Sequence, residues 1–188
     1  MERNELLQAI KLRMPEKRYV HTLGVTQTAM EMATFYGEDP KRAEVAAILH
    51  DVCKYADVDW MEKVVKEQGL DQTLLGWGSE LLHGPVGAYV AQTEFCVSDE
   101  GILDAIRYHT TGRASMSRLE KIIFVADMIE PNRKFEGVER LRDKAKKDLD
   151  KAVKACVRHS LTYLISSKQS IFPLSLECYN YLIKREEK

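Results

Sequence analysis

The residues best suited to chemistry are an adjacent pair, His50 and Asp51, at the end of an apolar helical stretch. Neutral imidazole and carboxylate are ligands that suit a divalent metal such as iron, manganese or zinc. Neighbouring side chains on a helix diverge around its axis by about 100°, so this pair cannot enclose a metal alone. If the pair binds a metal, other helices must bring further ligands to it.

Further candidate ligands are three histidines and one aspartate, each expected inside a helix or at its end: His21, His83, His109 and Asp127. Asp127 lies in an apolar stretch, where an unpaired charge would cost roughly several kcal/mol unless a metal, an arginine or a helix N-terminus compensates for it. Each residue alone is more often a hydrogen-bonded core residue. The whole series, embedded in helices, favours a metal site. His159 lies outside the series, and we interpret it as solvated or as a helix-face residue.

Composition limits the class of protein. The 188 residues are 45% hydrophobic and 30% charged, which is typical of one globular domain. A net charge of −1 argues against binding to nucleic acid polymers or membrane surfaces. Residues 1–5 do not resemble a signal peptide, and no apolar stretch reaches the ~20 residues of a membrane span, so a cytoplasmic location is expected. The cysteines are widely spaced and are expected to be reduced thiols: Cys53, Cys96, Cys156 and Cys178.

The elements that must position these residues are all predicted to be helices. Helices are expected at 4–14, 15–36, 39–50, 57–68, 84–95, 98–109, 117–129, 138–167 and 174–184, with a loop or short turns at 70–79. Ser117 and Glu120 have the spacing of a capping box, and Gly37 is a natural helix stop. We expect an all-α fold, a single domain over 1–188 with the ligand core at about 15–135 and C-terminal helices at about 138–185.

Blocks of sequence around these residues resemble one known family. RYVHTLGV (18–25), LHDVCK (49–54), LHGPVGA (82–88), HTTG (109–112) and ADMIEPNR (126–133) occur in order. They are similar to the YqeK family of HD-domain metal-dependent phosphohydrolases, which are symmetrical bis(5′-nucleosyl)-tetraphosphatases. The resemblance implies a helical bundle with the metal site in its core. It also implies cleavage of diadenosine tetraphosphate into two ADP, and iron as the metal, with manganese, cobalt or zinc as alternatives.

The resemblance implies a role for each candidate ligand. One metal would be held by His21, His50, Asp51 and Asp127. In a first arrangement, Asp51 bridges to a second metal held by His83 and His109, and paired metals about 3.5–4 Å apart activate water for phosphoryl displacement. In a second arrangement, one metal is present and these two histidines contact the phosphate directly. The sequence leaves both arrangements open.

The polyphosphate also needs positive charge, because negative charge increases on its leaving group. Lys54, one helical turn after Asp51, is the first candidate, followed by Arg18 and Arg133, although all three could be solvated surface residues. We expect Asp51 and Lys54 to act in catalysis. Other expected substrate contacts are Gly84, Thr110, Thr111, Gly112 and Phe172; Phe172 would stack on a base, although core packing is favoured on sequence grounds alone.

Two classes of function remain open at this point. The first is a hydrolase of dinucleoside tetraphosphates, with another nucleotide phosphohydrolase acting on dNTPs, nucleotides or cyclic dinucleotides as its alternative. The second is a non-catalytic nucleotide-binding module that kept the fold. A binder that had lost catalysis would be expected to lose ligands before packing residues, so the complete series favours the enzyme. Oligomeric state stays open, with a homodimer among the alternatives.

Overall fold

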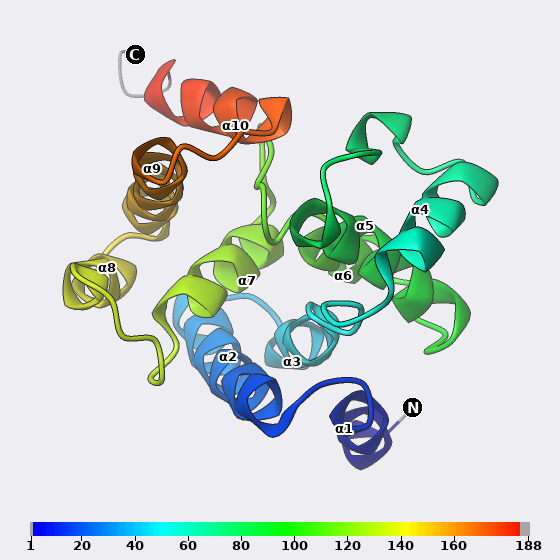
Figure 1. The fold of residues 1–188 in the computed structure, drawn as a ribbon. Coiled ribbons are helices and arrows are strands. Elements are labelled where there is room, and N and C mark those ends of the chain that lie inside the picture. Colours follow the sequence, from blue (N-terminus) through cyan, green and yellow to red (C-terminus); the bar gives the residue numbers. More distant parts are fainter. Residues whose placement is uncertain (1, 185–188) are drawn as a thin grey trace.

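Every regular element within residues 2–184, the part of the chain that this computed structural model describes, is a helix (Figure 1). The all-α prediction is therefore confirmed. The elements are α1 (Arg3–Lys11), α2 (Glu16–Tyr36), α3 (Pro40–Leu49), α4 (Val58–Glu67), the 3₁₀ turn η1 (Gln72–Leu74), α5 (Ser79–Thr93), α6 (Glu100–Arg107), α7 (Arg118–Ile129), α8 (Val138–Ala145), α9 (Leu149–Ser166) and α10 (Pro173–Lys184).

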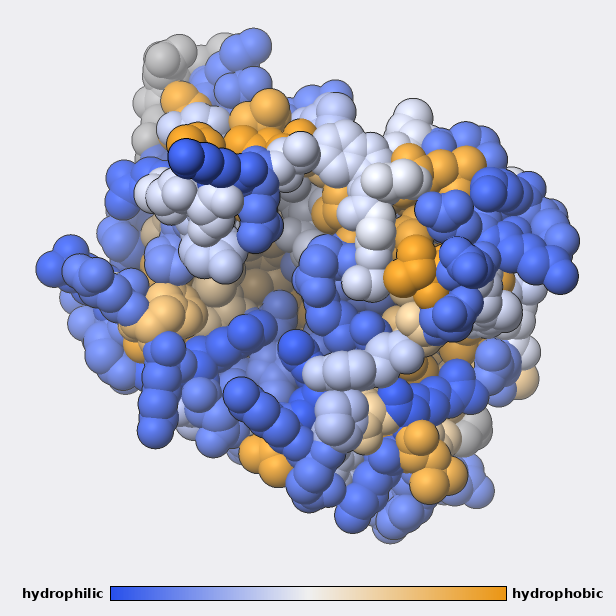
Figure 2. All heavy atoms as spheres, in the orientation of Figure 1, coloured by the Kyte–Doolittle hydropathy of each residue, from blue (hydrophilic) through white to orange (hydrophobic). Residues whose placement is uncertain are grey.

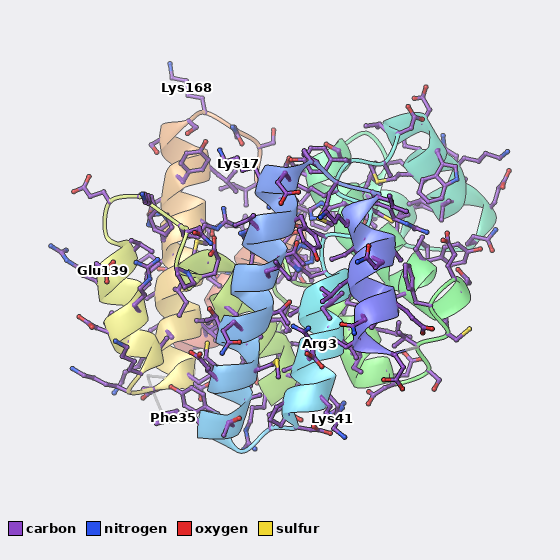
Figure 3. All side chains as sticks on the ribbon, turned by 90° about the horizontal axis from the view of Figure 1, so that it is seen from below. Arg3, Lys17, Phe35, Lys41, Glu139 and Lys168 are labelled. Carbon is purple, nitrogen blue, oxygen red and sulfur yellow. The ribbon has the colours of Figure 1, made fainter. Side chains whose placement is uncertain are left out.

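Helix α7 lies near the centre of the bundle. It packs against α2, α3, α6, α8 and α9, while α5 packs on α6 and α10 on α9 (Figure 1). Its apolar residues Ile122, Ile123, Val125 and Ala126 are fully buried, which explains why this stretch has apolar side chains on several faces. Helix α2 is seen along its length in Figure 3, with Lys17 in its first turn and Phe35 near its other end.

Local sequence signals set several helix ends. The Ser117 side chain accepts a hydrogen bond from the Glu120 backbone N–H, and Glu120 accepts in return from the Ser117 N–H, so the predicted capping box of α7 is confirmed. Gly37 ends α2 with φ +69°, in the left-handed region that glycine adopts without strain. Asp39 caps α3 by accepting from the Lys41 N–H.

The expected start of α5 at Gly84 is wrong. The helix begins at Ser79 and carries His83, Gly84 and Pro85 in its interior. Proline removes a helical hydrogen bond and usually marks a helix boundary, which is why the sequence favoured a start at this point. A Cβ on Gly84 would lie 2.9 Å from the backbone oxygen of Arg107, so α5 and the end of α6 approach closely here. Burial of the apolar residues around the proline offsets the missing bond: Leu82, Val86, Val90 and Ala91.

The expected single helix over 138–167 is also wrong. The chain forms α8 and then α9, because Asp148 leaves the helical conformation and its side chain accepts from the Lys151 N–H as an N-cap. Similarly, Asp99 caps α6, so this helix begins at Glu100 and not at the expected residue 98. In both places an aspartate acts as the helix cap, which periodicity alone does not reveal.

None of the helices in residues 2–184 has both the length and the apolarity needed to cross a membrane. The four cysteines are free thiols, and Cys53, Cys156 and Cys178 are buried. The expected single domain stays a prediction, and its ends, residue 1 and residues 185–188, lie outside the described residues.

Candidate metal centre

The predicted ligands come from separate helical segments and meet in the interior. His21 lies in α2, His50 is the C-cap of α3, Asp51 follows it, His83 lies in α5, His109 follows α6, and Asp127 lies in the last turn of α7. Tight turns after α3 turn Asp51 inward, with hydrogen bonds from Val52 N–H to Leu49 and from Lys54 N–H to Asp51. All of these side chains are buried except Asp127, which is 22% exposed.

The carboxylate of Asp51 lies between two pairs of histidines. Its Oδ2 is 3.2 Å from Nε2 of His50 and 3.9 Å from Nε2 of His21. Its Oδ1 is 3.3 Å from Nε2 of His83 and 3.8 Å from Nε2 of His109. Asp51 thus belongs to two groups, one with His21 and His50 and one with His83 and His109. Within each group the ligand atoms lie within 4.8 Å of one another. One carboxylate therefore serves two adjacent groups, each of which has the composition of a metal site.

Backbone carbonyls fix the orientation of three of these imidazole rings. Nδ1 of His50 lies 2.7 Å from the backbone oxygen of Ala47. The corresponding distances are 2.9 Å from His83 to Ser79 and 2.8 Å from His109 to Ile106. A carbonyl oxygen only accepts hydrogen bonds, so Nδ1 carries the proton in each ring. The lone pair of each neutral ring is then on Nε2, which is the atom that faces Asp51.

The site passes a test for a bound metal. The Nε2 atoms of His21 and His50 are buried, and within residues 2–184 neither makes a hydrogen bond of acceptable geometry, although carboxylate oxygens lie close to both. Oδ1 of Asp127 lies 2.9 Å from His21 Nε2 and 3.9 Å from His50 Nε2, so a second carboxylate faces the same two nitrogens. Buried nitrogens without partners are costly, and coordination to a divalent metal would satisfy both.

Burial and mutual charges set the protonation of the site. Burial alone would raise the pKa of Asp51, but the neighbouring imidazoles, first His50 and then His83 and His109, outweigh burial and hold that pKa well below its usual value. Burial likewise opposes a charge on His50, yet Asp51 and Asp127 raise its pKa. For His109, burial and the charges of its histidine neighbours act together and lower the pKa to about 3. His109 is therefore neutral at physiological pH and keeps a lone pair for binding.

A polar cavity of about 270 Å³ opens onto these ligands. It is lined by Asp51, His83, His109 and Asp127, by Thr110 and Ser160, and by charged residues of the surrounding segments: Arg18, Lys54, Glu80 and Arg133. On the face shown in Figure 2 the surface is hollowed over α7, between α5 and α9, and hydrophilic residues surround the lower edge of the hollow.

Each predicted phosphate-binding cation reaches the cavity, and each is paired with a carboxylate. Arg18 donates to Asp51 at 2.9 Å, Lys54 to Glu80 at 2.6 Å, and Arg133 to Asp127 at 2.7 Å. Glu80 is 75% exposed on its side chain, so the Lys54 pair is open to solvent on one side. The structure thus places all three cations beside the candidate ligands.

The other predicted substrate contacts divide into three groups. Thr110 lines the metal cavity, with its hydroxyl 3.1 Å from Nε2 of His109. Thr111 and Phe172 instead line a neighbouring cavity of about 240 Å³, which Thr110 also borders. Gly84 lies against the end of α6, and Gly112 adopts φ +63° beside Cys178. These two glycines do not line either cavity.

Sequence reasoning gave no role to two acidic residues of this region. Glu80 holds Lys54, and Glu130, which is 1% exposed, lies 3.1 Å from Nδ1 of His21. For Glu130 a signal was available, since it is a carboxylate one turn after Asp127 beside apolar Ile129. His159 lies outside the site, half-buried, with its ring 4.6 Å from that of Phe135.

Comparison with known proteins identifies the family. A family model described as HD domain matches residues 18–132, which contain every candidate ligand. A symmetrical bis(5′-nucleosyl)-tetraphosphatase of Halalkalibacterium halodurans is 46% identical over the full length of both chains. A protein of the same name from Bacillus subtilis is 45% identical over 97% of this chain and 98% of its own.

A solved structure gives the same result. A protein from Clostridium acetobutylicum, described as a predicted HD superfamily hydrolase involved in NAD metabolism, superposes with a TM-score of 0.93 at 36% identity and covers 98% of both chains. The sequence match, the full-length relatives and the shared fold agree with the buried histidine and aspartate cluster described above. The chain belongs to the HD domain family.

Proposed function

We propose that this chain is a metal-dependent hydrolase that cleaves diadenosine tetraphosphate, and related dinucleoside tetraphosphates, symmetrically into two ADP. The observation that carries the proposal is the position of Asp51, whose two oxygens face separate histidine pairs at the floor of a cavity bordered by Arg18, Lys54 and Arg133. Full-length relatives at 45–46% identity carry the name of this activity.

We propose that His21, His50, Asp51 and Asp127 hold one divalent metal, and that His83 and His109 hold a second metal with Asp51 or contact the phosphate. A metal bound there would lower the pKa of a water for attack on phosphorus and would neutralise phosphate oxygens. The family resemblance favours iron, with manganese, cobalt or zinc as alternatives. The division of the Asp51 oxygens between two groups supports the two-metal arrangement.

The cations of the chain have a separate task. Arg18, Lys54 and Arg133 neutralise the polyphosphate, whose leaving ADP gains negative charge as the bond breaks. Each cation is already oriented by a carboxylate, so little side-chain entropy is lost when phosphate oxygens approach. Thr110, beside His109, adds a hydroxyl at the same wall of the cavity.

We propose that the neighbouring cavity takes one nucleoside. Its walls are mostly apolar, and Phe172, 6% exposed, packs edge to face on Trp77 at 5.2 Å between ring centroids. A base could pack against Phe172 and Tyr108 while its phosphates reach past Thr110 to the metal centre. This geometry supports the predicted role of Phe172, although the same residue also packs against the core. We propose a cytoplasmic location, where such nucleotides occur.

Product analysis tests the proposed reaction. The protein is reconstituted with iron under anaerobic conditions and incubated with diadenosine tetraphosphate, and the products are separated by chromatography. ADP alone is expected, because cleavage at the centre of the tetraphosphate gives two identical halves. ATP together with AMP would overturn the symmetrical assignment. Turnover of dNTPs or cyclic dinucleotides in place of this substrate would assign the chain to the alternative class of phosphohydrolase.

Histidine variants provide the matched control. His50→Ala is expected to abolish turnover, because it removes a buried nitrogen of the candidate centre. His159→Ala is expected to stay within a few-fold of the unmodified protein, because it contacts Phe135 outside the cavity. Equal losses in two variants that both remain helical by circular dichroism would contradict the assignment of the site.

A further inference from the structure

The environment of His21 differs from that of the other candidate ligands. His50, His83 and His109 each donate Nδ1–H to a carbonyl of their own segment. Nδ1 of His21 instead lies 3.1 Å from Oε1 of Glu130, which is 109 residues later and just past the end of α7. A carboxylate is a stronger acceptor than a carbonyl, and it increases the basicity of the imidazole it contacts.

The second carboxylate oxygen of Glu130 accepts hydrogen bonds from Asn132. Oε2 accepts from the backbone N–H of Asn132 at 2.7 Å and from the Asn132 side-chain amide at 3.0 Å. Glu130 is 1% exposed, so these donors and His21 replace its hydration. Donors therefore approach both oxygens of Glu130: His21 approaches Oε1, and Asn132 approaches Oε2. A carboxylate satisfies all of these donors, because each of its oxygens accepts hydrogen bonds.

The sequence of α2 leaves space for this carboxylate. Gly24 lies one turn after His21, and a Cβ at this position would overlap Oε2 of Glu130 and lie 3.3 Å from the Asn132 side-chain amide nitrogen. Glycine in a helix interior costs roughly 1 kcal/mol relative to alanine. The glycine of α2 therefore lies at the point where the carboxylate passes and leaves room for Glu130 beside His21.

We infer that Glu130 is a positioning residue of the metal centre: it holds the proton of His21 on Nδ1 and directs the lone pair of Nε2 toward Asp51 and Asp127. The inference rests on the metal site of the proposed function. Both carboxylates lie within 4 Å of that nitrogen, 2.9 Å for Asp127 and 3.9 Å for Asp51. Without an acceptor at Nδ1, the ring could carry its proton on Nε2 and could not bind a metal through that atom.

Glu130→Gln tests this inference because its amide offers one acceptor and one donor. The backbone N–H of Asn132 cannot change its role, so it takes the amide oxygen, and the amide NH₂ then faces Nδ1 of His21. That contact favours the tautomer with the proton on Nε2. Metal-free protein is titrated with Mn²⁺, and free Mn²⁺ is measured by electron paramagnetic resonance. The variant is expected to bind about 10- to 100-fold more weakly.

Glu120→Gln is the matched control. Glu120 is a buried carboxylate in the first turn of α7, 2% exposed, but it pairs with Arg113 and contacts no candidate ligand. Its replacement is expected to lower the unfolding temperature and leave Mn²⁺ affinity unchanged. Loss of stability without loss of affinity in Glu130→Gln, the pattern of the control, would overturn the inference.

Two further measurements separate positioning from folding. Gly24→Ala keeps the charge of Glu130 and favours the helix, yet it displaces the carboxylate, so Mn²⁺ affinity is expected to fall; unchanged affinity would count against the inference. Nitrogen-15 shifts of His21 in the metal-free protein should show protonation on Nδ1, and on Nε2 in Glu130→Gln. Because no substrate is used, normal Mn²⁺ binding by both variants would refute the role of Glu130 and leave the proposed hydrolysis intact.

Discussion

At the scale of single residues, the centre depends on which atom of each side chain faces inward. His109 is neutral at physiological pH, because burial and neighbouring histidines lower its pKa to about 3. The pKa of Asp127 is lowered below its usual value, since its contact with His21 and the charge of Arg133 outweigh burial. The site thus combines a neutral His109 with ionised Asp51 and Asp127 carboxylates, which are protonation states that metal binding requires.

Lys54 allows a sharp test at this scale, because the chain contains a close match to it. Lys54 pairs with exposed Glu80 at 2.6 Å inside the cavity, and Lys121 pairs with exposed Asp150 at 2.6 Å outside it. Lys54→Ala is expected to lower kcat/KM by about ten- to a hundred-fold, the value of one charge-assisted phosphate contact, while bound metal is retained. Steady-state kinetics and elemental analysis measure the two quantities.

The companion variant Lys121→Ala is expected to keep kcat/KM within about two-fold, because it loses a similar ion pair away from the substrate. Wild-type efficiency in Lys54→Ala would return that residue to the solvated surface. A loss in kcat would mean that the contact of Lys54 forms mainly in the transition state. A loss confined to KM would mean that the contact stabilises the bound substrate and the transition state equally.

At the scale of elements, the end of α6 positions His109 and its start is held by Asp99. The Asp99 carboxylate accepts from the Gly101 and Ile102 backbone N–H groups at 2.8 and 3.3 Å. The Arg42 guanidinium of α3 donates to both of its oxygens, at 2.8 and 2.9 Å. Hydrogen bonding from Arg42 is the main reason that the pKa of Asp99 is lowered.

Substitution separates the cap from the ion pair. Asp99→Ala is expected to lose roughly 1 kcal/mol from the cap and at most roughly 1 kcal/mol from the largely exposed pair. Asp99→Asn keeps a capping oxygen and should lose only the second contribution. Because the folded pKa lies below the unfolded value, the ionised form stabilises the fold above pH ~4, and this stability is lost as the pH falls through the folded pKa. Urea denaturation at pH 7 and pH 3 measures the free energy of unfolding of each protein. The difference in this free energy between the native protein and Asp99→Asn is expected to shrink at pH 3, and a larger difference at pH 3 would contradict this assignment.

How far the sequence predicts these elements depends on the kind of signal. Gly37, Asp39 and Ser117 act through the backbone beside them, so the ends they set were predictable. Pro85 led to a wrong prediction of where α5 begins. The cost of a proline inside this helix is offset by tertiary burial, which the local sequence pattern does not show. The histidine and aspartate series was found because ligands have distinctive chemistry. The pairing of Glu130 with His21 was not found, since it joins segments 109 residues apart.

At the scale of the whole molecule, the C-terminal helices support the centre from outside the family match, which ends at residue 132. Arg142 of α8 donates to the backbone oxygens of Ile129, Glu130 and Arg133 at 2.9, 2.8 and 3.1 Å. These bonds hold the end of α7, where Asp127 and Glu130 lie. Ser160 of α9 lines the cavity itself. The prediction of an HD-type family is confirmed, and the C-terminal helices are part of how this chain builds its site.

Because the ligands come from segments across residues 21–127, the unfolded chain cannot assemble the centre, and metal should stabilise only the fold. A metal at about 100 times its Kd stabilises by about 2.7 kcal/mol, or roughly 5–11 °C in Tm for a chain of this size. We expect Mn²⁺ to raise the Tm of the native protein by such an amount in differential scanning calorimetry. Asp51→Asn should abolish the shift, since this side chain faces both histidine pairs, whereas His159→Ala should keep it even if its starting Tm is lower. An undiminished shift in Asp51→Asn would mean that the metal binds elsewhere on the chain.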